Sequence, residues 1–383
     1  MEFDVVTLSM GVVGTSRKEN ESRVAIHPRH IEWIDPKLRR QIWFERGYGE
    51  KFSVQDEDLL KMGVHLATRD ELMERCDVIL NPKPVVDDLK AMRPGTVLWG
   101  WPHCVQQRQM TQIAIDRKLT LIAWEAMFTW SGQQQKLMHI FYKNNEMAGY
   151  CGVLDALRLT GLDGHYGPRK KAVVLSFGSV SRGAICALQG RGFHDIDIYT
   201  KRPPYSVADQ VPGLTFRQLT YDKEGHLLGL RVDGKHQRFS EVLSQADIIV
   251  NGTLQDTDNP TDFLTEDEVS LLRKDTLIID ISCDEAMGFP FARPTTIEEP
   301  TFVVRDNITY YAVDHTPTYL WNAASWVISK SIHPFIGHVM EGPKSWSDNV
   351  TIDRSIEIRG GQIQNPKILS FQNRSPEYPH HTL

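Results

Sequence analysis

Two apolar segments of this 383-residue chain each end in a single titratable side chain. Val78 to Pro84 (VILNPKP) presents Lys83 between two prolines, and Val97 to Val105 (VLWGWPHCV) presents His103. Taken singly, the lysine could be a solvated loop charge and the histidine a core residue. Because successive parallel strands end at the same edge of a sheet, where α/β proteins bind ligands, we expect the two side chains to lie together. Such a lysine can polarise a keto oxygen while the histidine moves a proton.

A third candidate, Arg23, follows a polar loop in the segment Asn20 to Pro28 (NESRVAIHP), and we expect a short strand after it. A guanidinium there could hold a carboxylate through two parallel hydrogen bonds. The alternative, favoured by the residue alone, is a surface arginine paired with Glu19 or Glu21.

The segment Lys170 to Pro204 has the pattern of half a dinucleotide site. Ala172 to Phe177 predicts a buried parallel strand, and Gly183 to Gly190 lies in a helix whose N-terminus favours a phosphate. In register with G-x-G-x-x-G the key positions are Ser176, Gly178 and Ser181, so one glycine of three remains. The alternative is a plain strand-to-helix turn.

The end of the next strand indicates the cofactor. Thr200, Lys201 and Arg202 stand where an NAD site usually has a carboxylate for the ribose 2′-hydroxyl, and they would attract a 2′-phosphate instead. Further strands expected at Ala246 to Asn251 and Thr276 to Ile281 end in small or polar residues that could line a cofactor site. The sequence therefore predicts NADP(H).

Composition argues against several classes of protein. A net charge of −6 and a pI near 6.2 provide no basic excess for binding nucleic acid. No apolar run approaches a membrane span, and the acidic N-terminus does not resemble a signal peptide, so we expect a cytoplasmic protein. The five cysteines are scattered without a C-x-x-C pair, and this pattern argues against a disulfide framework and against a structural metal site. His380 and His381 lie in a polar end that we expect to be flexible.

The fold prediction is α/β, with two Rossmann-like doubly wound domains, a cleft between them, and the nucleotide domain inserted in the substrate domain. Apolar runs alternate with amphipathic stretches before residue 145, and long helices are expected at Tyr142 to Leu159 and Thr318 to Met340. We predict a substrate domain at 1–144, an NADP-binding domain at 145–315, and a return to the substrate domain at 316–383 with a flexible C-terminal tail.

Several motifs carry a family resemblance over residues 10–340. They are RKENESRVAIHP, NPKP, WGWPHC, HIFYKNNEMAGYCGVLDAL, FGSVSRGA, LIIDISCDEAMGFPFARPTTIEEPTFVV and YYAVDHTP. Together they resemble the superfamily of alanine dehydrogenase, transhydrogenase and lysine-forming saccharopine dehydrogenase, and within it the N5-(carboxyethyl)ornithine synthase branch.

The resemblance implies roles by position. Arg23 and Lys83 would bind the carboxylate and keto group of the substrate, His103 would act as acid and base, and Asp284 would lie near the nicotinamide, with a helix cap or turn as its alternative. His315 stands where alanine dehydrogenases have asparagine. The implied cofactor contacts are Gly178, Ser179, Val180, Ser181, Thr200, Lys201, Arg202, Asn251, Gly252, Ser282 and His315.

The implied reaction is an NADPH-dependent reductive condensation of a pyruvate-like 2-oxo acid with the amine of ornithine or lysine. Glu125, Glu146 and Asp314 are possible partners for the distal charge of that amine. An amino-acid oxidoreductase resembling alanine or saccharopine dehydrogenase and a non-catalytic NADP-binding module are the alternatives. We expect a homo-oligomer.

Overall fold

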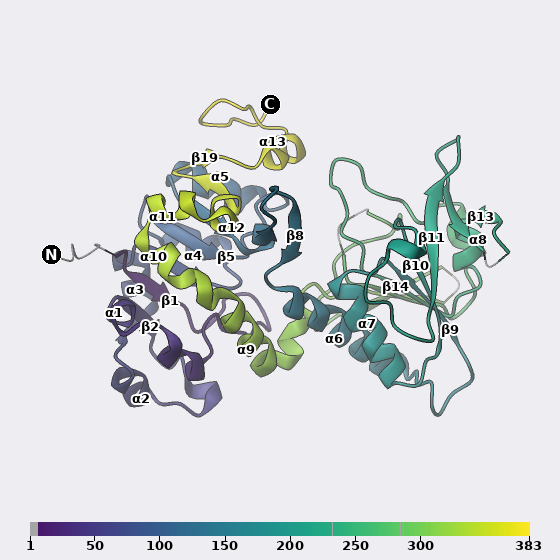
Figure 1. Cartoon of the computed structure of the whole chain (residues 1–383), viewed down its shortest axis with the longest axis horizontal. Helices are drawn as coiled ribbons and strands as arrows, with labels where there is room; N and C mark the ends of the chain where they lie inside the picture. Colours follow the sequence, from purple (N-terminus) through teal and green to yellow (C-terminus); the bar gives the residue numbers. More distant parts are fainter. Residues whose placement is uncertain (1–6, 232, 284, 286, 306) are drawn as a thin grey trace. The chain divides into compact units, whose positions relative to one another are not determined.

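The computed structural model describes residues 7–231, 233–283, 285, 287–305 and 307–383, and the chain divides into two compact units (Figure 1). The first unit comprises Met1–Tyr142 together with Leu320–Leu383, and the second comprises Lys143–Tyr319. The second unit is thus inserted into the first. Both units are α/β, as the sequence predicts.

The first unit contains an eight-stranded sheet in the order β19-β18-β6-β5-β4-β1-β2-β3. The strands β1 to β6 are parallel, and β18 pairs antiparallel with β6. Their bounds are β1 Met10–Val12, β2 Ile42–Glu45, β3 His65–Ala67, β4 Val78–Asn81, β5 Val97–Gly100, β6 Thr120–Ala123, β18 Ile356–Arg359 and β19 Gln362–Ile363.

The central strands of this sheet, VILN, VLWG and TLIA, are mostly apolar and are buried on both faces, as is usual for parallel strands. Leu80, Trp99 and Ile122 face one apolar cluster, while Ile79 and Leu98 face another. Helices cover both faces, with bounds α1 Pro36–Arg39, α2 Asp56–Lys61, α3 Arg69–Arg75, α4 Val86–Ala91, α5 Arg108–Asp116, α9 Trp321–Ile332, α10 Ile336–Glu341, α11 Pro343–Asp348, α12 Val350–Asp353 and α13 Pro366–Gln372. A separate hairpin joins β7 Phe128–Trp130 to β8 Lys136–His139.

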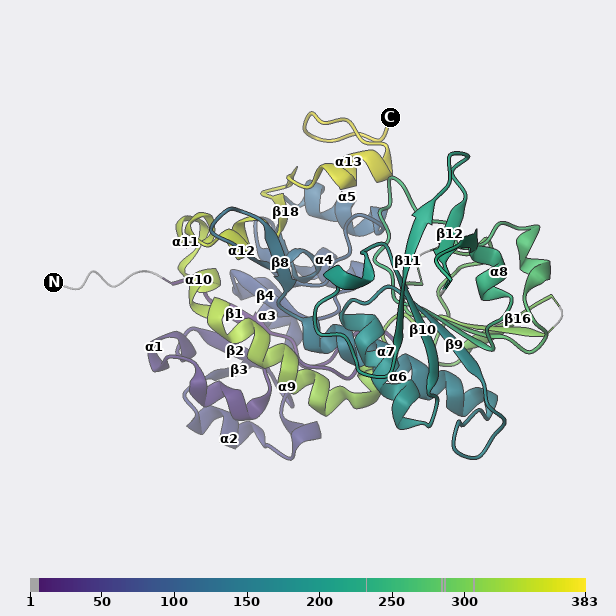
Figure 2. The same cartoon turned by 45° about the vertical axis from the view of Figure 1, so that its right-hand side comes forward.

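The returning segment completes the first unit. In Figures 1 and 2 the yellow-green helices α9 and α10 lie beside the purple N-terminal strands. The Val24 amide donates to Ser325 Oγ at 2.9 Å, and the Leu8 amide donates to the Met340 carbonyl at 2.6 Å. The first unit is therefore built from both ends of the chain.

The second unit contains a nine-stranded sheet in the order β13-β12-β11-β10-β9-β14-β15-β17-β16. The strands β11, β10, β9, β14, β15 and β17 are parallel, while β12, β13 and β16 are antiparallel to their neighbours. Their bounds are β9 Lys171–Leu175, β10 Asp195–Thr200, β11 Thr215–Tyr221, β12 Leu227–Leu230, β13 His236–Arg238, β14 Ile248–Asn251, β15 Leu277–Asp280, β16 Thr301–Val304 and β17 Ile308–Tyr311.

Helices cover both faces of this sheet as well. The helices α6 (Tyr142–Thr160) and α7 (Ser179–Gly190) pack on one face, and α8 (Phe239–Leu243) packs on the other. The helices α6 and α7 cross very closely, because a Cβ placed on Gly183 would lie 1.7 Å from the Glu146 carbonyl oxygen. A Cβ on Gly149 would likewise lie 1.9 Å from the Val180 carbonyl oxygen. This crossing fixes the start of α7.

Several elements differ from those that the sequence predicts. The structure describes residues 21–27 throughout and places no strand there, so the short strand expected after Arg23 is wrong. The expected helix from Thr318 to Met340 is divided at η7 (His333–Phe335), because Pro334 cannot donate a helical hydrogen bond. The antiparallel pair β12 and β13 was not predicted.

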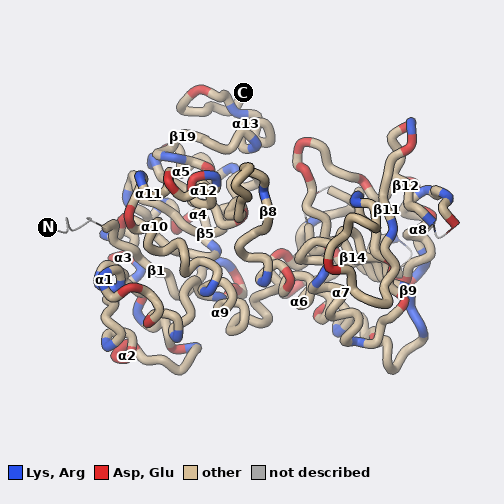
Figure 3. Tube along the Cα trace, in the orientation of Figure 1, with Lys and Arg blue, Asp and Glu red and all other residues tan. Residues whose placement is uncertain are grey.

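The C-terminal end is packed rather than extended into solvent, which differs from the flexible tail that the sequence suggests. His380 is buried, the Ile363 amide donates to its Nε2 at 3.1 Å, and Arg374 Nη1 donates to its carbonyl at 3.1 Å. Figure 3 shows acidic and basic residues interspersed along both units. Among the described helices, none is long and apolar enough to cross a membrane.

Candidate functional site

Lys83 and His103 lie together at the carboxyl edge of the first sheet. The strands β4 and β5 are parallel neighbours, with Asn81 opposite Gly100. Lys83 follows β4 and His103 follows β5, and their Nζ and Nε2 atoms are 3.1 Å apart. The structure therefore brings together the two side chains that the strand ends predict to be neighbours.

The donor and acceptor roles in this contact depend on the protonation of the lysine. A Lys83 ammonium only donates hydrogen bonds, so with it Nε2 of His103 accepts and the ring proton lies on Nδ1. Nδ1 lies 4.0 Å from Oε1 of Glu125. If Nε2 also carried a proton, two donors, Nε2–H and the Lys83 ammonium, would face each other. His103 can therefore accept a proton at Nε2 only when Lys83 moves to another acceptor.

The backbone of His103 is held in an uncommon conformation. Its φ of 48° lies in the left-handed region, which is unfavourable for a residue with a Cβ and is often found at functional sites. The His103 amide donates to Glu125 Oε1 at 2.7 Å. Glu125 thus holds the backbone of His103 in place.

A buried carboxylate, Asp88, holds the loop that carries Lys83. Asp88 Oδ2 accepts from the Asn81 side chain at 3.1 Å and from the Val85 amide at 3.0 Å. Its Oδ1 accepts from Arg69 Nη2 at 2.9 Å. Both ends of the Lys83 loop are therefore fixed. We did not predict a role for Asp88, although an acid at the third position of a helix after a strand-end loop is a recognised capping signal.

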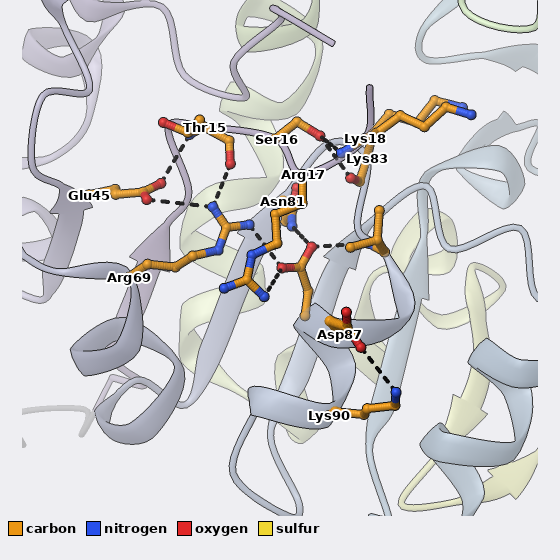
Figure 4. Close-up of polar contacts among 12 residues, drawn as sticks. Thr15, Ser16, Arg17, Lys18, Glu45, Arg69, Asn81, Lys83, Asp87 and Lys90 are labelled. Carbon is orange, nitrogen blue, oxygen red and sulfur yellow. Dashed lines mark hydrogen bonds and ion pairs between the residues drawn. The ribbon is translucent and has the colours of Figure 1, made fainter. Parts of the chain in front are cut away.

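The loop after β1 is joined to the same edge. Glu45 Oε2 accepts from the Gly14 amide at 2.7 Å and the Thr15 amide at 3.0 Å, and Ser16 Oγ donates to the Lys83 carbonyl at 3.2 Å (Figure 4). The carboxyl ends of β1, β2 and β4 therefore form one connected polar network.

Arg23 is buried and paired within the chain. Its Nε donates to Glu21 Oε1 at 2.8 Å and its Nη2 to Glu21 Oε2 at 2.5 Å, with side-chain exposures of 2% and 0%. Burial alone would raise the pKa of Glu21, but the charge and hydrogen bonds of Arg23 outweigh it and hold that pKa below its usual value. The guanidinium also lies over the Trp101 ring, 5.5 Å from its centroid. Glu21 is thus its partner, but the pair is buried rather than on the surface.

The three carboxylates considered for the distal charge of an amine each contact a neighbouring group. Glu125 contacts the His103 amide, Glu146 pairs with Lys143 at 2.7 Å, and Asp314 hydrogen-bonds to His315. His315 itself is buried. Glu125 belongs to the first unit and lies next to the pair formed by Lys83 and His103.

In the second unit, the start of α7 has the features of a phosphate site. Gly178 is the N-cap, and no side chain in the described part of the chain caps this helix. A Cβ on Gly178 would meet a single described atom within 4 Å, the Ser176 Oγ at 3.8 Å. The Cα of Gly178 therefore leaves room for a ligand to approach closely, and the first-turn N–H groups, which have no side-chain cap, favour an anion.

Serine replaces glycine at two positions of the turn, and the two serines are accommodated in different ways. Ser176 adopts a φ of 75°, a conformation that glycine reaches more easily, and its amide donates to the Tyr199 carbonyl at 2.7 Å. Ser181 is fully buried, and its hydroxyl donates to the Leu175 carbonyl at 3.0 Å. The degenerate sequence motif thus retains the geometry of a strand, a tight turn and a helix.

Basic side chains gather around this turn. Lys201 and Arg202 follow β10, and Arg202 Nη2 donates to the Phe177 carbonyl at 3.2 Å. The guanidinium of Arg182 lies 4.0 Å from the centroid of the Phe177 ring. Lys201 Nζ donates to Thr261 Oγ1 at 2.9 Å. We did not predict that Arg182 lies beside this turn. Its place one helical turn after Gly178 is the only indication in the sequence.

The loops after β14 and β15 are tied to one another by the buried Asp280. Its Oδ1 accepts from the Asn251 side chain at 3.0 Å and from the Ser282 amide at 3.1 Å, and burial raises its pKa to about 6. A Cβ on Gly252 would lie 2.5 Å from Ser181 Oγ, so this loop touches the start of α7. The candidate residue Asp284 lies outside the described residues.

The second unit also contains a cluster of three titratable side chains and a cavity, neither of which includes a residue named above as a site candidate. Asp222, Glu224 and His226 could approach a cation at the turn between β11 and β12, but Asp222 already accepts from the amides of the other two, which indicates a turn cap. A cavity of about 250 Å³ is lined by Lys171, Asp197, Tyr199, Arg217, Arg231, Asp233, Gln237, Val242 and Gln245. Asp197 pairs with both Lys171 and Arg217, so we assign the cavity no part in the chemistry.

Two family models match the chain. The model described as "Alanine dehydrogenase/PNT, N-terminal domain" matches residues 12–146, and the one described as "Alanine dehydrogenase/PNT, C-terminal domain" matches residues 172–366.

Characterised relatives carry two different names. An N(5)-(carboxyethyl)ornithine synthase from Clostridium botulinum is 24% identical over 82% of this chain and 89% of its own length. An alanine dehydrogenase from Mycolicibacterium smegmatis is 23% identical over 94% of both chains. A further N(5)-(carboxyethyl)ornithine synthase from Lactococcus lactis is 25% identical over 84% of this chain and 94% of its own length.

Solved structures support the fold class. An L-alanine dehydrogenase superposes with a TM-score of 0.71 at 16% identity, covering 95% of this chain and 99% of its own. A transhydrogenase from Sinorhizobium meliloti superposes with a TM-score of 0.68 at 18% identity, covering 93% and 99%. The predicted fold of two Rossmann-like units is thereby confirmed.

Proposed function

Because this chain belongs to the alanine dehydrogenase/PNT family, we propose that it is an NADP-dependent oxidoreductase that condenses a 2-oxo acid with an amino acid. The oxo acid is pyruvate or a close analogue, and the nucleophile is the side-chain amine of ornithine or lysine. The product is a secondary amine. The observation that carries this proposal is the contact of 3.1 Å between Lys83 Nζ and His103 Nε2.

Lys83 and His103 divide the work of the condensation. The Lys83 ammonium donates to the keto oxygen and stabilises the negative charge that develops there as the C–N bond forms. His103 Nε2, released from the lysine, takes two protons in turn from the substrate ammonium, one before and one after the attack, and passes both to the oxygen, which leaves as water. The bound nucleotide supplies the hydride that reduces the resulting C=N bond.

The substrate carboxylate is assigned to Arg23. Glu21 accepts hydrogen bonds from its Nε and Nη2, and burial holds the pair in place. Binding of a carboxylate would therefore cost little additional side-chain entropy at Arg23. Glu21 and a carboxylate ligand would together balance the charges of Arg23 and Lys83. We therefore expect Glu21 to set the orientation of Arg23 rather than to bind the substrate.

The nucleotide is assigned to the start of α7 and the basic residues around it. The open first turn of α7 receives the pyrophosphate, and Lys201 and Arg202 receive the 2′-phosphate. The loops of Asn251, Gly252 and Ser282, with His315, form the remaining proposed contacts, and Asp284 retains its proposed role near the nicotinamide. The absence of a carboxylate among Thr200, Lys201 and Arg202 favours NADPH over NADH.

A simple amino-acid dehydrogenase that uses ammonia is the second candidate, and the relative from Mycolicibacterium smegmatis favours it. The two reactions are separated by following NADPH oxidation with pyruvate and either ornithine, lysine or ammonia. We expect saturation with ornithine or lysine, slow turnover with ammonia at matched concentration, and a product whose mass is that of both reactants less water plus two hydrogens. Alanine as the dominant product, with ornithine and lysine inert, would contradict the condensation.

The roles of the pair are tested by His103→Gln and Lys83→Met, with Lys90→Met as the matched control. Lys90 is exposed and pairs with Asp87 on α4, so its replacement should leave turnover near that of the parent. We expect His103→Gln to lower turnover by about 10² to 10⁴ with NADPH affinity retained, the usual range for a lost general acid or base. Turnover within a few-fold of the parent would assign His103 to the core instead.

A further inference from the structure

Behind His103, the structure places two carboxyl groups that the proposed mechanism does not use. Glu125 lies in η3 (Trp124–Ala126), directly after β6, and Glu357 lies in β18, the antiparallel neighbour of β6. Glu357 is 4% exposed. Both belong to the first unit, and they come from its two separate chain segments.

The backbone of β18 is irregular at Glu357. In a regular strand residues two apart share a face of the sheet, but Ile356 packs in the apolar cluster of one face and Ile358 in that of the other. The pairing with β6 shifts register between Ile356 and Ile358, which is the geometry of a β-bulge. Bulges redirect side chains and are common beside active sites. A carboxyl group between two isoleucines is costly to bury, so its position needs an explanation other than packing.

Neither carboxyl group is fully satisfied. Glu125 Oε1 accepts from the His103 amide, and Glu357 Oε1 accepts from the Asn365 side chain at 3.1 Å. The Oε2 atom of each is buried and has no hydrogen-bond partner among the described residues. Burial raises the pKa of both groups, and the charge of Glu357 raises the pKa of Glu125 further.

Among the described residues, Lys83 is the cation whose charge acts on Glu125, and none acts comparably on Glu357. The Cys104 thiol is buried beside both carboxyl groups, and burial raises its pKa, so it stays neutral. Burial lowers the pKa of His139 to about 4, so this ring, which contacts the Trp124 carbonyl at 2.9 Å, is also neutral. Lys83 attracts the Glu125 charge, and His103 contacts Glu125 directly. One positive charge cannot balance two buried carboxylates.

We propose that Glu125 and Glu357 together retain one proton at neutral pH and thereby determine how readily His103 takes up its own. This inference rests on the proposed acid and base role of His103. With the proton retained, a single negative charge is divided between the carboxyl near His103 and the one farther away. Glu357 therefore acts indirectly: by carrying most of the negative charge, it lets Glu125 stay largely neutral beside the imidazole.

The isosteric variant Glu357→Gln decides between this arrangement and two ionised carboxylates. If the pair holds one proton, removing the Glu357 charge lowers the pKa of Glu125, so more of this carboxyl is ionised beside His103 and the imidazole keeps its proton to higher pH. If both groups are already ionised, the same change removes a negative charge, and the imidazole loses its proton at lower pH. The two cases therefore differ in sign.

The measurement is an NMR titration of the His103 ring in the full-length protein, with the signal assigned by its loss in His103→Gln. We expect Glu357→Gln to raise the midpoint by roughly half a pH unit or more, given an opposite charge formed about 4 to 6 Å away. The low-pH limb of the rate profile should move the same way. Glu125→Gln should leave the midpoint unchanged or lower it, and the exposed control Glu57→Gln should not move it. A lowered or unchanged midpoint in Glu357→Gln would overturn the inference.

A second measurement covers the case in which Glu357→Gln does not fold. Infrared spectra of the parent at neutral pH should contain the carbonyl band of a protonated buried carboxyl, and Glu125→Gln should lose it. Absence of that band in the parent also contradicts the inference. Neither experiment needs turnover, so a failure of the proposed reaction and a failure of the carboxyl pair are distinguishable.

Discussion

Replacing Gly183 by alanine tests the helix crossing that supports the proposed nucleotide site. The added Cβ would lie 1.7 Å from the Glu146 carbonyl oxygen and 2.6 Å from its carbonyl carbon, whereas ordinary contacts begin near 3.4 Å. Both neighbouring atoms belong to the backbone of α6, so a side-chain rotation cannot relieve the clash. The two helices would have to separate by roughly 1.5 Å, and we expect a cost of about 3 kcal/mol, the upper end for overpacking.

That cost converts to a lower melting temperature. For a domain of this size, about 2 to 4 °C is lost per kcal/mol, so Gly183→Ala should melt roughly 6 to 12 °C below the parent. NADPH affinity should fall as well, because the displaced helix carries Ser179 and Val180 at its start. Circular dichroism at increasing temperature and fluorescence titration with NADPH measure the two effects.

Gly190 provides the matched control within the same helix. A Cβ there meets nothing within 4 Å, so Gly190→Ala should be neutral or slightly stabilising through helix propensity. The two variants add the same methyl group to α7. Equal melting temperatures for them would refute the conclusion that the close crossing excludes a side chain.

Two further predictions concern cofactor choice and pH. Replacing Lys201 and Arg202 together by uncharged residues should weaken NADPH far more than NADH, since each charge-assisted bond is worth about 1.5 to 3 kcal/mol, and an equal loss in binding assays would exclude a 2′-phosphate contact. Burial lowers the pKa of His30 to about 4 from the usual 6.5, so this neutral ring contributes stability above pH 6.5 that is lost as pH falls towards 4. Denaturant melts should therefore show a shallower loss of stability over that range in His30→Phe, and an unchanged slope would show that His30 does not titrate on unfolding.

The sequence was most informative where a local pattern determines position. Continuous apolar runs predicted the buried strands β4, β5, β9, β14 and β15. The adjacency of Lys83 and His103 follows from parallel strands alone, since each side chain comes shortly after its strand. A tight turn before α7 was also predictable, because the glycine at 178 and the small residues around it leave few alternatives.

Other parts of the site depend on long-range packing, which local patterns do not encode. Glu357 comes beside the strand that leads to Glu125 through the antiparallel pairing of β18 with β6, whose register shifts at this point. Glu21 and Arg23 look like exposed loop charges in the sequence, yet the surrounding chain buries them as a pair. The extension by β12 and β13 was missed because β12 is only four residues of Leu and Gly and β13 is three polar residues, so neither shows the alternation of a strand.

The return of the chain to the first unit has a consequence for biosynthesis. On the ribosome, Lys143–Tyr319 emerges before the segment that carries β18, so the inserted unit can fold while the first sheet still lacks an edge. Until that segment arrives, the exposed side of β6 is an unpaired strand next to Glu125 and His103. Nascent chains should therefore be able to form the proposed nucleotide site before β18 covers the edge of β6 beside Glu125, and this open edge is exposed to chaperones and proteases during that interval.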